Sequence, residues 1–141
     1  MSADQPLTAD DVMGMFAESP FIAALGMEVT SLDGEAGTIT VRMPMTPLAE
    51  RGKDTNQFHG GPLASLIDVA GDFAVALSVG GGVPTIDLRV DYLRPAFGPH
   101  VDANAKARRV GRTVGIADVD VVGADGKLVA IGRGCYSAKR G

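Results

Sequence analysis

The stretch 57-QFHGGPLASLIDVAGDFAVAL-77 decides the fold of this chain. From Leu63 onward its residues are apolar almost all round a helix, and a helix of that kind is normally buried in a core. Two carboxylates interrupt the apolar surface, Asp68 and Asp72, and their spacing of four residues puts them on the same face. The stretch therefore predicts a buried helix with a narrow acidic seam, an arrangement that needs a chemical reason.

The composition predicts one globular domain over residues 1–141. The chain has 141 residues, of which 45% are hydrophobic, and this is enough for a core without disulfide bonds. A net charge of −4 argues against a nucleic-acid partner. The single cysteine, Cys135, cannot form an internal disulfide, which favours a reducing compartment. The two histidines follow no HExxH pattern and no CxxC pair is present, so no metal site is predicted.

The start of the chain and its longest apolar run favour a soluble, cytoplasmic protein. The first 11 residues, MSADQPLTADD, are acidic and lack the apolar segment of a signal peptide. The best candidate for a membrane span, from Leu63 to Val79, is broken by two aspartates. We therefore expect no membrane partner.

Helices are expected at the N-terminus and in the middle of the chain. Thr8 and Asp11 form a capping-box pattern that predicts a short helix from Ala9 to Ala17. Pro20 begins a second helical turn, so residues 1–26 form an N-terminal helical segment. The long helix follows the loop at 46–61 and ends at 78-SVGGGVP-84, where glycines and a proline break it.

Strands are expected on both sides of the long helix. GTITVRMPM (37–45) alternates apolar and polar residues before the helix. Four more strands are predicted after it, at 85–95, 100–110, 114–123 and 127–137. In the first of these, Ile86, Leu88, Val90 and Tyr92 are expected to share one face. The order predicts an α+β fold in which a sheet of about five strands, the last four in a meander, buries one face on the helix. Its open edges favour a homodimer.

The start of the long helix is suited to binding a carbonyl oxygen. Gly60 and Gly61 allow the backbone to approach a ligand closely, and Pro62 suits a first helical turn because it has no N–H to satisfy. The free N–H groups and partial positive charge of such an end stabilise a developing oxyanion. Further along, Ser65 and Asp68 continue the polar stripe that begins at Gly61.

This pattern resembles a known family. His59-Gly60-Gly61, followed nine residues after the histidine by Asp68, is similar to the hotdog-fold acyl-CoA thioesterases of the phenylacetate-degradation and 4-hydroxybenzoyl-CoA types. The resemblance runs from about Phe21 to Tyr136 and includes TIDLRVDYLRPA (85–96), VGRT (110–113) and KLVAIGRG (127–134). It implies a long helix wrapped by a five- to six-stranded antiparallel sheet, and a homodimer or homotetramer. It also implies no cofactor, with coenzyme A entering only as part of the substrate.

The resemblance also implies roles for the residues at the motif. Asp68 would act as general base for water or as nucleophile on the thioester carbonyl, and the Gly60 N–H would polarise that carbonyl. Thr85 matches a hydroxyl position that helps to place the water from the partner subunit. His59 is expected mainly to order its loop. In this family the site lies at the dimer interface, so Asp68 of one chain would face the HGG loop of the other.

Substrate-binding residues are less sharply defined. Many relatives carry Asn or Gln six residues before the histidine, where this chain has Lys53, and the nearby Asn56 and Gln57 are candidates to replace that amide. Gly61 lines the same turn. Arginine suits phosphate through its planar fork, and the candidates for the nucleotide end of coenzyme A are Arg94 and Arg112.

Asp72 is the second departure, because relatives often have Ser or Thr there. Two carboxylates one turn apart in a cleft cannot both ionise cheaply, so one of Asp68 and Asp72 should have a raised pKa. Two other functions stay open: a hotdog hydratase acting on acyl thioesters, and a module that binds acyl-CoA or fatty acid without turnover. The sequence leaves open the acyl group, which could be short, aromatic or medium-chain, and the carrier, which could be coenzyme A or an acyl-carrier protein.

Overall fold

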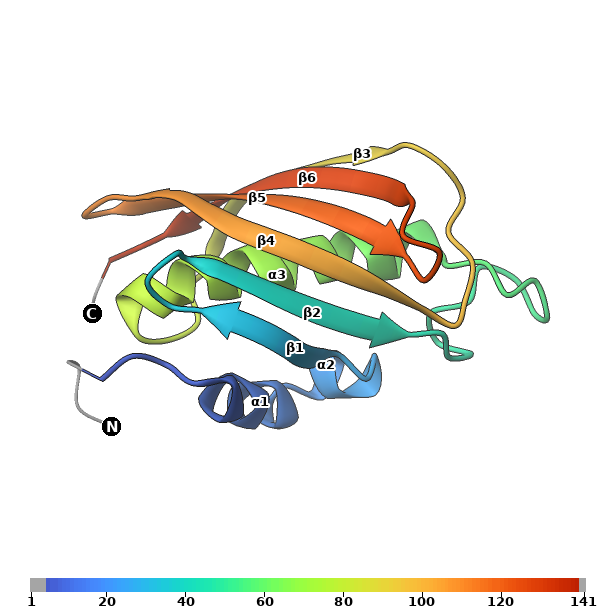
Figure 1. The fold of residues 1–141 in the computed structure, drawn as a ribbon, viewed down its shortest axis with the longest axis horizontal. Helices are drawn as coiled ribbons and strands as arrows, with labels where there is room; N and C mark the ends of the chain where they lie inside the picture. The colour runs from blue at the N-terminus through green and yellow to red at the C-terminus, as the bar shows by residue number, and fades with distance from the viewer. Residues whose placement is uncertain (1–4, 140–141) are drawn as a thin grey trace.

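The computed structural model describes residues 5–139, which form one antiparallel sheet curved around a long helix. Figure 1 shows this helix behind the sheet and the two short helices beside the β1 edge. The elements in chain order are α1 (Ala9–Glu18), α2 (Pro20–Ala24), β1 (Glu28–Asp33), β2 (Thr38–Pro44), α3 (Gly60–Val79), β3 (Thr85–Tyr92), β4 (His100–Val110), β5 (Val114–Gly123) and β6 (Leu128–Ser137). The predicted α+β class and the wrapped helix are both confirmed.

The N-terminal helix forms as its capping residues predict. The Asp11 N–H donates to Thr8 Oγ1 at 3.1 Å, and the Thr8 N–H donates to Asp11 Oδ2 at 2.8 Å, so both arms of the capping box are made. Phe16 of α1 meets Phe73 of α3 edge to face, with ring centroids 5.1 Å apart. This contact joins the N-terminal segment to the core helix.

The sheet has six strands in the order β1-β2-β4-β5-β6-β3, so the predicted four-strand meander is wrong. Strands β4, β5 and β6 are consecutive neighbours, but β3 pairs with β6 at the far edge. The two glycine-containing segments that flank β3, at 80–82 and 93–99, let the chain cross from one edge of the sheet to the other. As a result β3 is an edge strand next to α3.

Strand β1 did not emerge from the sequence because a bulge hides its period. Val29 pairs with Val41 and Leu32 with Ile39, so apolar residues three apart both face the core, with a register shift between Val29 and Ser31. A bulge inserts one extra residue into a strand and breaks the alternation of two. Apolar spacing of three is therefore compatible with a strand at this position.

A second bulge lies at the start of β3, and because of it Ile86 does not face the side of the strand that the sequence predicts. Thr85 pairs with Tyr136 and Asp87 with Cys135, which leaves Ile86 as the extra residue. Ile86 is 59% exposed, so the prediction that it shares the inner face of Leu88 is wrong. Without the bulge, strict alternation would put Ile86 inward and Thr85 outward. The bulge therefore turns Thr85 toward α3.

Helix α3 packs closely on the sheet because the strands above it carry very small residues. A Cβ at Gly132 would lie 2.5 Å from Ile67 Cγ2, and a Cβ at Gly115 would lie 2.6 Å from Val75 Cγ1. These glycines let the helix approach the strands closely, so that Leu66 and Ile67 are fully buried. By length and composition α3 could cross a membrane, but most of its apolar window is buried inside the protein, as in a core helix.

Candidate functional site

The start of α3 leaves one backbone donor unused. His59 is the N-cap, and its Nδ1 accepts a hydrogen bond from the Gly61 N–H at 3.0 Å. Pro62 has no N–H, and the Leu63 N–H reaches back to the His59 carbonyl. Among the hydrogen bonds of residues 5–139 none uses the Gly60 N–H, which is therefore available at the positive end of the helix. The geometry gives His59 a capping contact that orders this turn.

Tyr92, at the end of β3, is a neighbour of this turn that no local sequence pattern indicates. Its hydroxyl donates to the Gly60 carbonyl at 2.7 Å, and a Cβ at Gly60 would lie 3.3 Å from that hydroxyl. Both Gly60 and Tyr92 line a cavity of about 340 Å³ that also includes Gln57 and Arg94. Three predicted site residues therefore meet in one cavity at the N-terminal end of α3.

The central acid of the helix is held by the edge strand. Thr85 Oγ1 donates to Asp68 Oδ1 at 2.7 Å, and both residues belong to the same chain. The bond engages one carboxylate oxygen of Asp68 and leaves Oδ2 without a side-chain partner among the described residues. Asp68 is half-buried, so it is accessible from the β3 edge of the molecule. Ser65, on the same stripe, donates back to the Gly61 carbonyl at 3.0 Å.

Asp72 has the raised pKa that the pair of carboxylates predicts. Its pKa is raised from the ordinary 3.8 to about 7, mainly by burial, with a smaller contribution from the nearby Asp68 carboxylate and against a hydrogen bond from the Val83 N–H that lowers it. That hydrogen bond joins Val83 N to Asp72 Oδ1 at 3.0 Å. Asp72 therefore contacts the segment leading into β3, two residues before Thr85.

Tyr136 supports the turn of α3 that carries Asp68. It is completely buried, and its hydroxyl donates to the Asp68 backbone carbonyl at 2.9 Å. A side chain at Gly71 or Gly134 would collide with the Tyr136 ring. Burial and the Asp68 charge raise the pKa of the Tyr136 hydroxyl well above its usual range, so this group stays a neutral donor. No local sequence pattern indicates the contact, because the two residues lie 68 positions apart.

The loop before the helix is held by Glu50. Its carboxylate accepts from the Asp54 N–H at 3.2 Å and from the Asn56 N–H at 2.9 Å. Asn56 and Asp54 both have positive φ, at 57° and 64°. Asn56 and Lys53 are exposed, whereas Gln57 is half-buried and pairs with Phe97 in an isolated bridge. Of the two amides considered as replacements for the family's amide, only Gln57 lines the cavity with Gly60.

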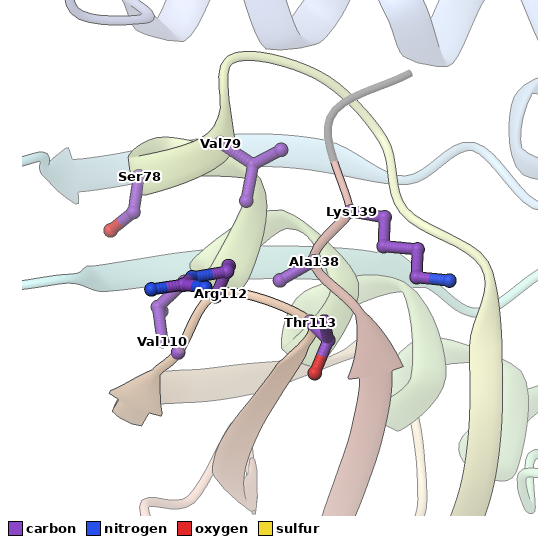
Figure 2. A pocket seen from close by; sticks show the side chains of 8 residues that line it. Ser78, Val79, Val110, Arg112, Thr113, Ala138 and Lys139 are labelled. Carbon is purple, nitrogen blue, oxygen red and sulfur yellow. The ribbon is translucent and has the colours of Figure 1, made fainter.

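The two arginines considered for coenzyme A lie at different ends of α3. Arg94 lines the cavity at the N-terminal end, whereas Arg112 lines a cavity of about 590 Å³ that includes Ser78 and Val79 at the C-terminal end. Figure 2 shows Arg112 and Lys139 in this second cavity with side chains pointing in opposite directions. The structure thus does not bring Arg94 and Arg112 together within one chain. Among residues 5–139, no group of three His, Cys, Asp or Glu side chains is placed to hold a metal ion.

Comparisons with known proteins agree with this fold. A profile of the thioesterase superfamily matches residues 56–130, which contain the helix, Asp68 and most of the sheet. The acyl-coenzyme A thioesterase PaaI of Escherichia coli is 34% identical over 122 residues, with 85% of this chain and 83% of PaaI covered. The medium/long-chain acyl-CoA thioesterase YigI of the same organism is 30% identical over 138 residues, with 82% and 86% covered.

A solved structure from the thioesterase superfamily is 36% identical to this chain and superposes with a TM-score of 0.85, over 92% of this chain and 96% of its own. The profile match covers more than half of the sequence, and both Escherichia coli relatives are aligned over most of their length. The six-stranded antiparallel sheet around a central helix is the hotdog fold, and it agrees with the family of these relatives. The chain is therefore a member of the thioesterase superfamily, with a hotdog fold and the thioester-hydrolase activity of an acyl-CoA thioesterase.

Proposed function

We propose that this enzyme hydrolyses a short, aromatic or medium-chain acyl-CoA to a carboxylate and free coenzyme A, with Asp68 as its general base or nucleophile. The observation that carries the proposal is the 2.7 Å hydrogen bond from Thr85 to Asp68 Oδ1. It fixes the carboxylate and leaves Oδ2 to act. The carboxylate is only half-buried, which suits a group that must meet water and substrate.

The reaction needs a base and an oxyanion donor. With Asp68 as base, Oδ2 takes a proton from water while the water oxygen bonds to the thioester carbon, and the Gly60 N–H stabilises the oxyanion. The tetrahedral intermediate then breaks its carbon–sulfur bond, and the thiolate receives the proton. With Asp68 as nucleophile, the carboxylate instead displaces the thiolate to form an anhydride, which water hydrolyses.

The spacing along α3 supports an active site shared by two chains. Gly60 and Asp68 are eight residues apart on one helix, which corresponds to about 12 Å along its axis. Hydrogen-bonding groups that act on a single carbonyl must each lie about 3 Å from it. One rigid helix cannot place both there. We therefore propose a homodimer, or a dimer of such dimers, in which the Asp68 of one chain works with the Gly60 of the other at the exposed edge strand β3.

The remaining predicted site residues suit an enzyme that takes coenzyme A only as part of its substrate. Gln57 and Arg94 line the cavity beside Gly60, where they would contact the thioester's carrier arm and its phosphates. Asn56 lies at the rim of the loop, and Arg112 would have to contact a carrier bound at the other end of α3. The name of YigI specifies medium and long chains whereas that of PaaI specifies no acyl group, so a panel of substrates has to settle the chain length.

The first experiment is thiol release from a panel of acyl-CoAs, followed with a disulfide dye. We expect Asp68→Asn to lower kcat by ~10² or more on the best substrate, as removal of a general base does. The panel identifies the acyl class. Cleavage by Asp68→Asn at the wild-type rate would reject Asp68 as the general base or nucleophile.

The oxyanion donor can be tested without deleting a side chain. Gly60 is the first helical residue and His59 has φ −68° and ψ 147°, so the backbone accepts proline at position 60. Proline removes the N–H and, like alanine, adds a Cβ 3.3 Å from the Tyr92 hydroxyl. Gly60→Ala is the matched control, since it adds a Cβ and keeps the donor. We expect Gly60→Pro to lower kcat by ~10²–10³, the typical cost of one oxyanion-hole donor, and Gly60→Ala to lower it much less. Equal losses would mean that the N–H is not the relevant group.

Mixed subunits test the shared site. An Asp68→Asn chain and a Gly60→Pro chain each lack one half of the machinery. If the site combines Asp68 of one chain with Gly60 of the other, random mixing restores roughly a quarter of wild-type activity, because half of the dimers are mixed and one of their two sites is intact. If both groups act within one chain, the mixture stays inactive.

A further inference from the structure

Two hydrogen bonds connect α3 to the segment that enters β3. Thr85 donates to Asp68 Oδ1 at 2.7 Å, and the Val83 N–H donates to Asp72 Oδ1 at 3.0 Å. The helix residues are four apart, about 6 Å along the axis, and the segment residues are two apart, about 6.6 Å in an extended chain. The helix and the segment run in opposite directions around the Gly80 turn. The spacing of the two acceptors therefore matches that of the two donors, and both bonds can form together.

The connection itself does little to fix the start of β3. It contains Gly80, Gly81 and Gly82, and Gly80 has a φ of 102°. Glycine is the residue with the greatest backbone freedom, so this turn alone leaves the position of the next residues poorly set. The sheet holds the backbone at Pro84, whose carbonyl accepts from the Ser137 N–H at 2.8 Å, but the bulge at Ile86 interrupts the pairing with β6 directly after Thr85. The Asp72 contact joins Val83, which lies between the glycine turn and this bulge, to α3.

Asp72 makes this contact at an energetic cost. It is half-buried in an apolar helix, beside a second carboxylate, and its raised pKa measures how unfavourable the charged form is in that place. Residues that break the local rules of a fold are expected mainly at functional sites. A Ser or an apolar residue would fill the position at lower cost, so the contact itself needs an explanation.

We infer that Asp72 is a positioning residue: by accepting the Val83 N–H it fixes the first residues of β3, so that the Thr85 hydroxyl holds the Asp68 carboxylate in its catalytic orientation. Asp72 acts through Val83 and Thr85 and does not itself touch the reacting atoms. The inference rests on the proposed role of Asp68.

The test compares two changes at one position. Asp72→Asn keeps an oxygen that can accept the Val83 N–H, whereas Asp72→Ala removes it. We expect Asp72→Ala to lower kcat by about 10–100-fold with KM changed less than about 3-fold, because misplacement of a catalytic group by ~1 Å has effects of this size. Asp72→Asn should stay within about 3-fold of wild type. If the alanine variant does not fold, Asp72→Ser, whose short side chain does not reach Val83, replaces it.

A double-mutant cycle separates positioning from a purely structural role. Thr85→Val removes the hydroxyl through which Asp72 is inferred to act, so Asp72→Ala should cost less than about 3-fold in a Thr85→Val background. Multiplicative losses in kcat would overturn the inference, as would an Asp72→Asn variant as impaired as the alanine variant. Loss of thermal stability in Asp72→Ala without a change in kcat would assign Asp72 a structural role only.

Amide hydrogen exchange tests the anchor independently of turnover. In the wild-type protein the Val83 N–H should be protected, and Asp72→Ala should abolish that protection while Asp72→Asn retains it. Fast exchange at Val83 in the wild type would overturn the inference. An unaffected Asp72→Ala beside an inactive Asp68→Asn would reject the positioning role and leave the proposed function intact. A fully active Asp68→Asn would reject both.

Discussion

Replacing Asp72 by Asn should make the protein more stable at neutral and alkaline pH. Burial raises the pKa of Asp72 from 3.8 to about 7 in the folded state. Between these values the folded chain holds a proton at Asp72 that the unfolded chain has lost, so the free energy of unfolding falls as pH rises through this window. At about 1.4 kcal/mol for each pH unit, the full window corresponds to on the order of 4 kcal/mol. The asparagine variant has no proton to lose, and its side-chain oxygen can still accept from Val83.

The assay is denaturant unfolding of both proteins at one fixed protein concentration, at several pH values between 4 and 8.5. The free energy of unfolding of Asp72→Asn minus that of the wild type should be smallest near pH 4, grow through the window and level off above about pH 7. Asp120→Asn, which removes the same charge from an exposed position on β5, is the control for net charge. A difference that stays constant across this pH range, or one that shrinks as pH rises, would refute the reasoning.

Three further predictions concern the surroundings of the site. Tyr92→Phe removes the hydrogen bond to the first carbonyl of α3, and we expect kcat to fall about 3–10-fold with little change in unfolding midpoint, because one neutral hydrogen bond contributes about 1 kcal/mol. Gly134→Ala places a Cβ against the buried Tyr136 ring, so overpacking should lower the free energy of unfolding by about 1–3 kcal/mol, as measured by denaturant titration. Arg94→Ala should raise KM for acyl-CoA more than Arg112→Ala does, since Arg94 shares a cavity with the unused helix donor; steady-state kinetics decide this.

Each of these predictions has an outcome that contradicts it. A Tyr92→Phe enzyme with wild-type kcat would show that the phenol does not help to orient the helix start. If Gly134→Ala leaves the free energy of unfolding unchanged, the Tyr136 ring can move aside without a loss of stability. A larger KM effect for Arg112 would place the carrier phosphates at the C-terminal end of α3.

The sequence predicts the parts of the fold whose patterns are local. The apolar run of α3, its glycine stop, the alternation in β2 and β4 and the strands β5 and β6 all depend on neighbouring residues, and all are confirmed. Two of the failures, the missed strand β1 and the predicted face of Ile86, share one physical cause. Bulges at Thr30 and Ile86 each add a residue to an edge strand, and this shifts the period on which strand prediction depends. The place of β3 at the far edge follows from long-range pairing, which no local pattern reports.

In the candidate site too, the residues that the sequence predicts have a local signal, and those that it misses are brought in by long-range contacts. Asp68 and Asp72 stand out because charges in an apolar helix are rare, and Gly60 because a glycine pair precedes a helix start. Tyr92 and Tyr136 contact the site across 32 and 68 positions of sequence, and a tyrosine in a strand looks like ordinary core. The sequence offers Arg94 and Arg112 as equal candidates for binding coenzyme A phosphates, yet the fold places them at opposite ends of α3.

Because Ile86 is exposed, two pairing registers compete at the start of β3: the observed one, with the bulge, and one without it. A slip of one residue that closed the bulge would bury this isoleucine, which is worth about 1.5–3 kcal/mol of transfer free energy, and would turn Thr85 away from the helix. In the observed register Ile86 stays exposed, so a single chain does not obtain this transfer free energy. The beginning of β3 is thus a locally frustrated segment, in which the apolar pattern and the hydrogen bonds to α3 favour different registers. Its register depends on the hydrogen bonds made by Asp68, Asp72 and Thr85 as well as on the burial of Val83.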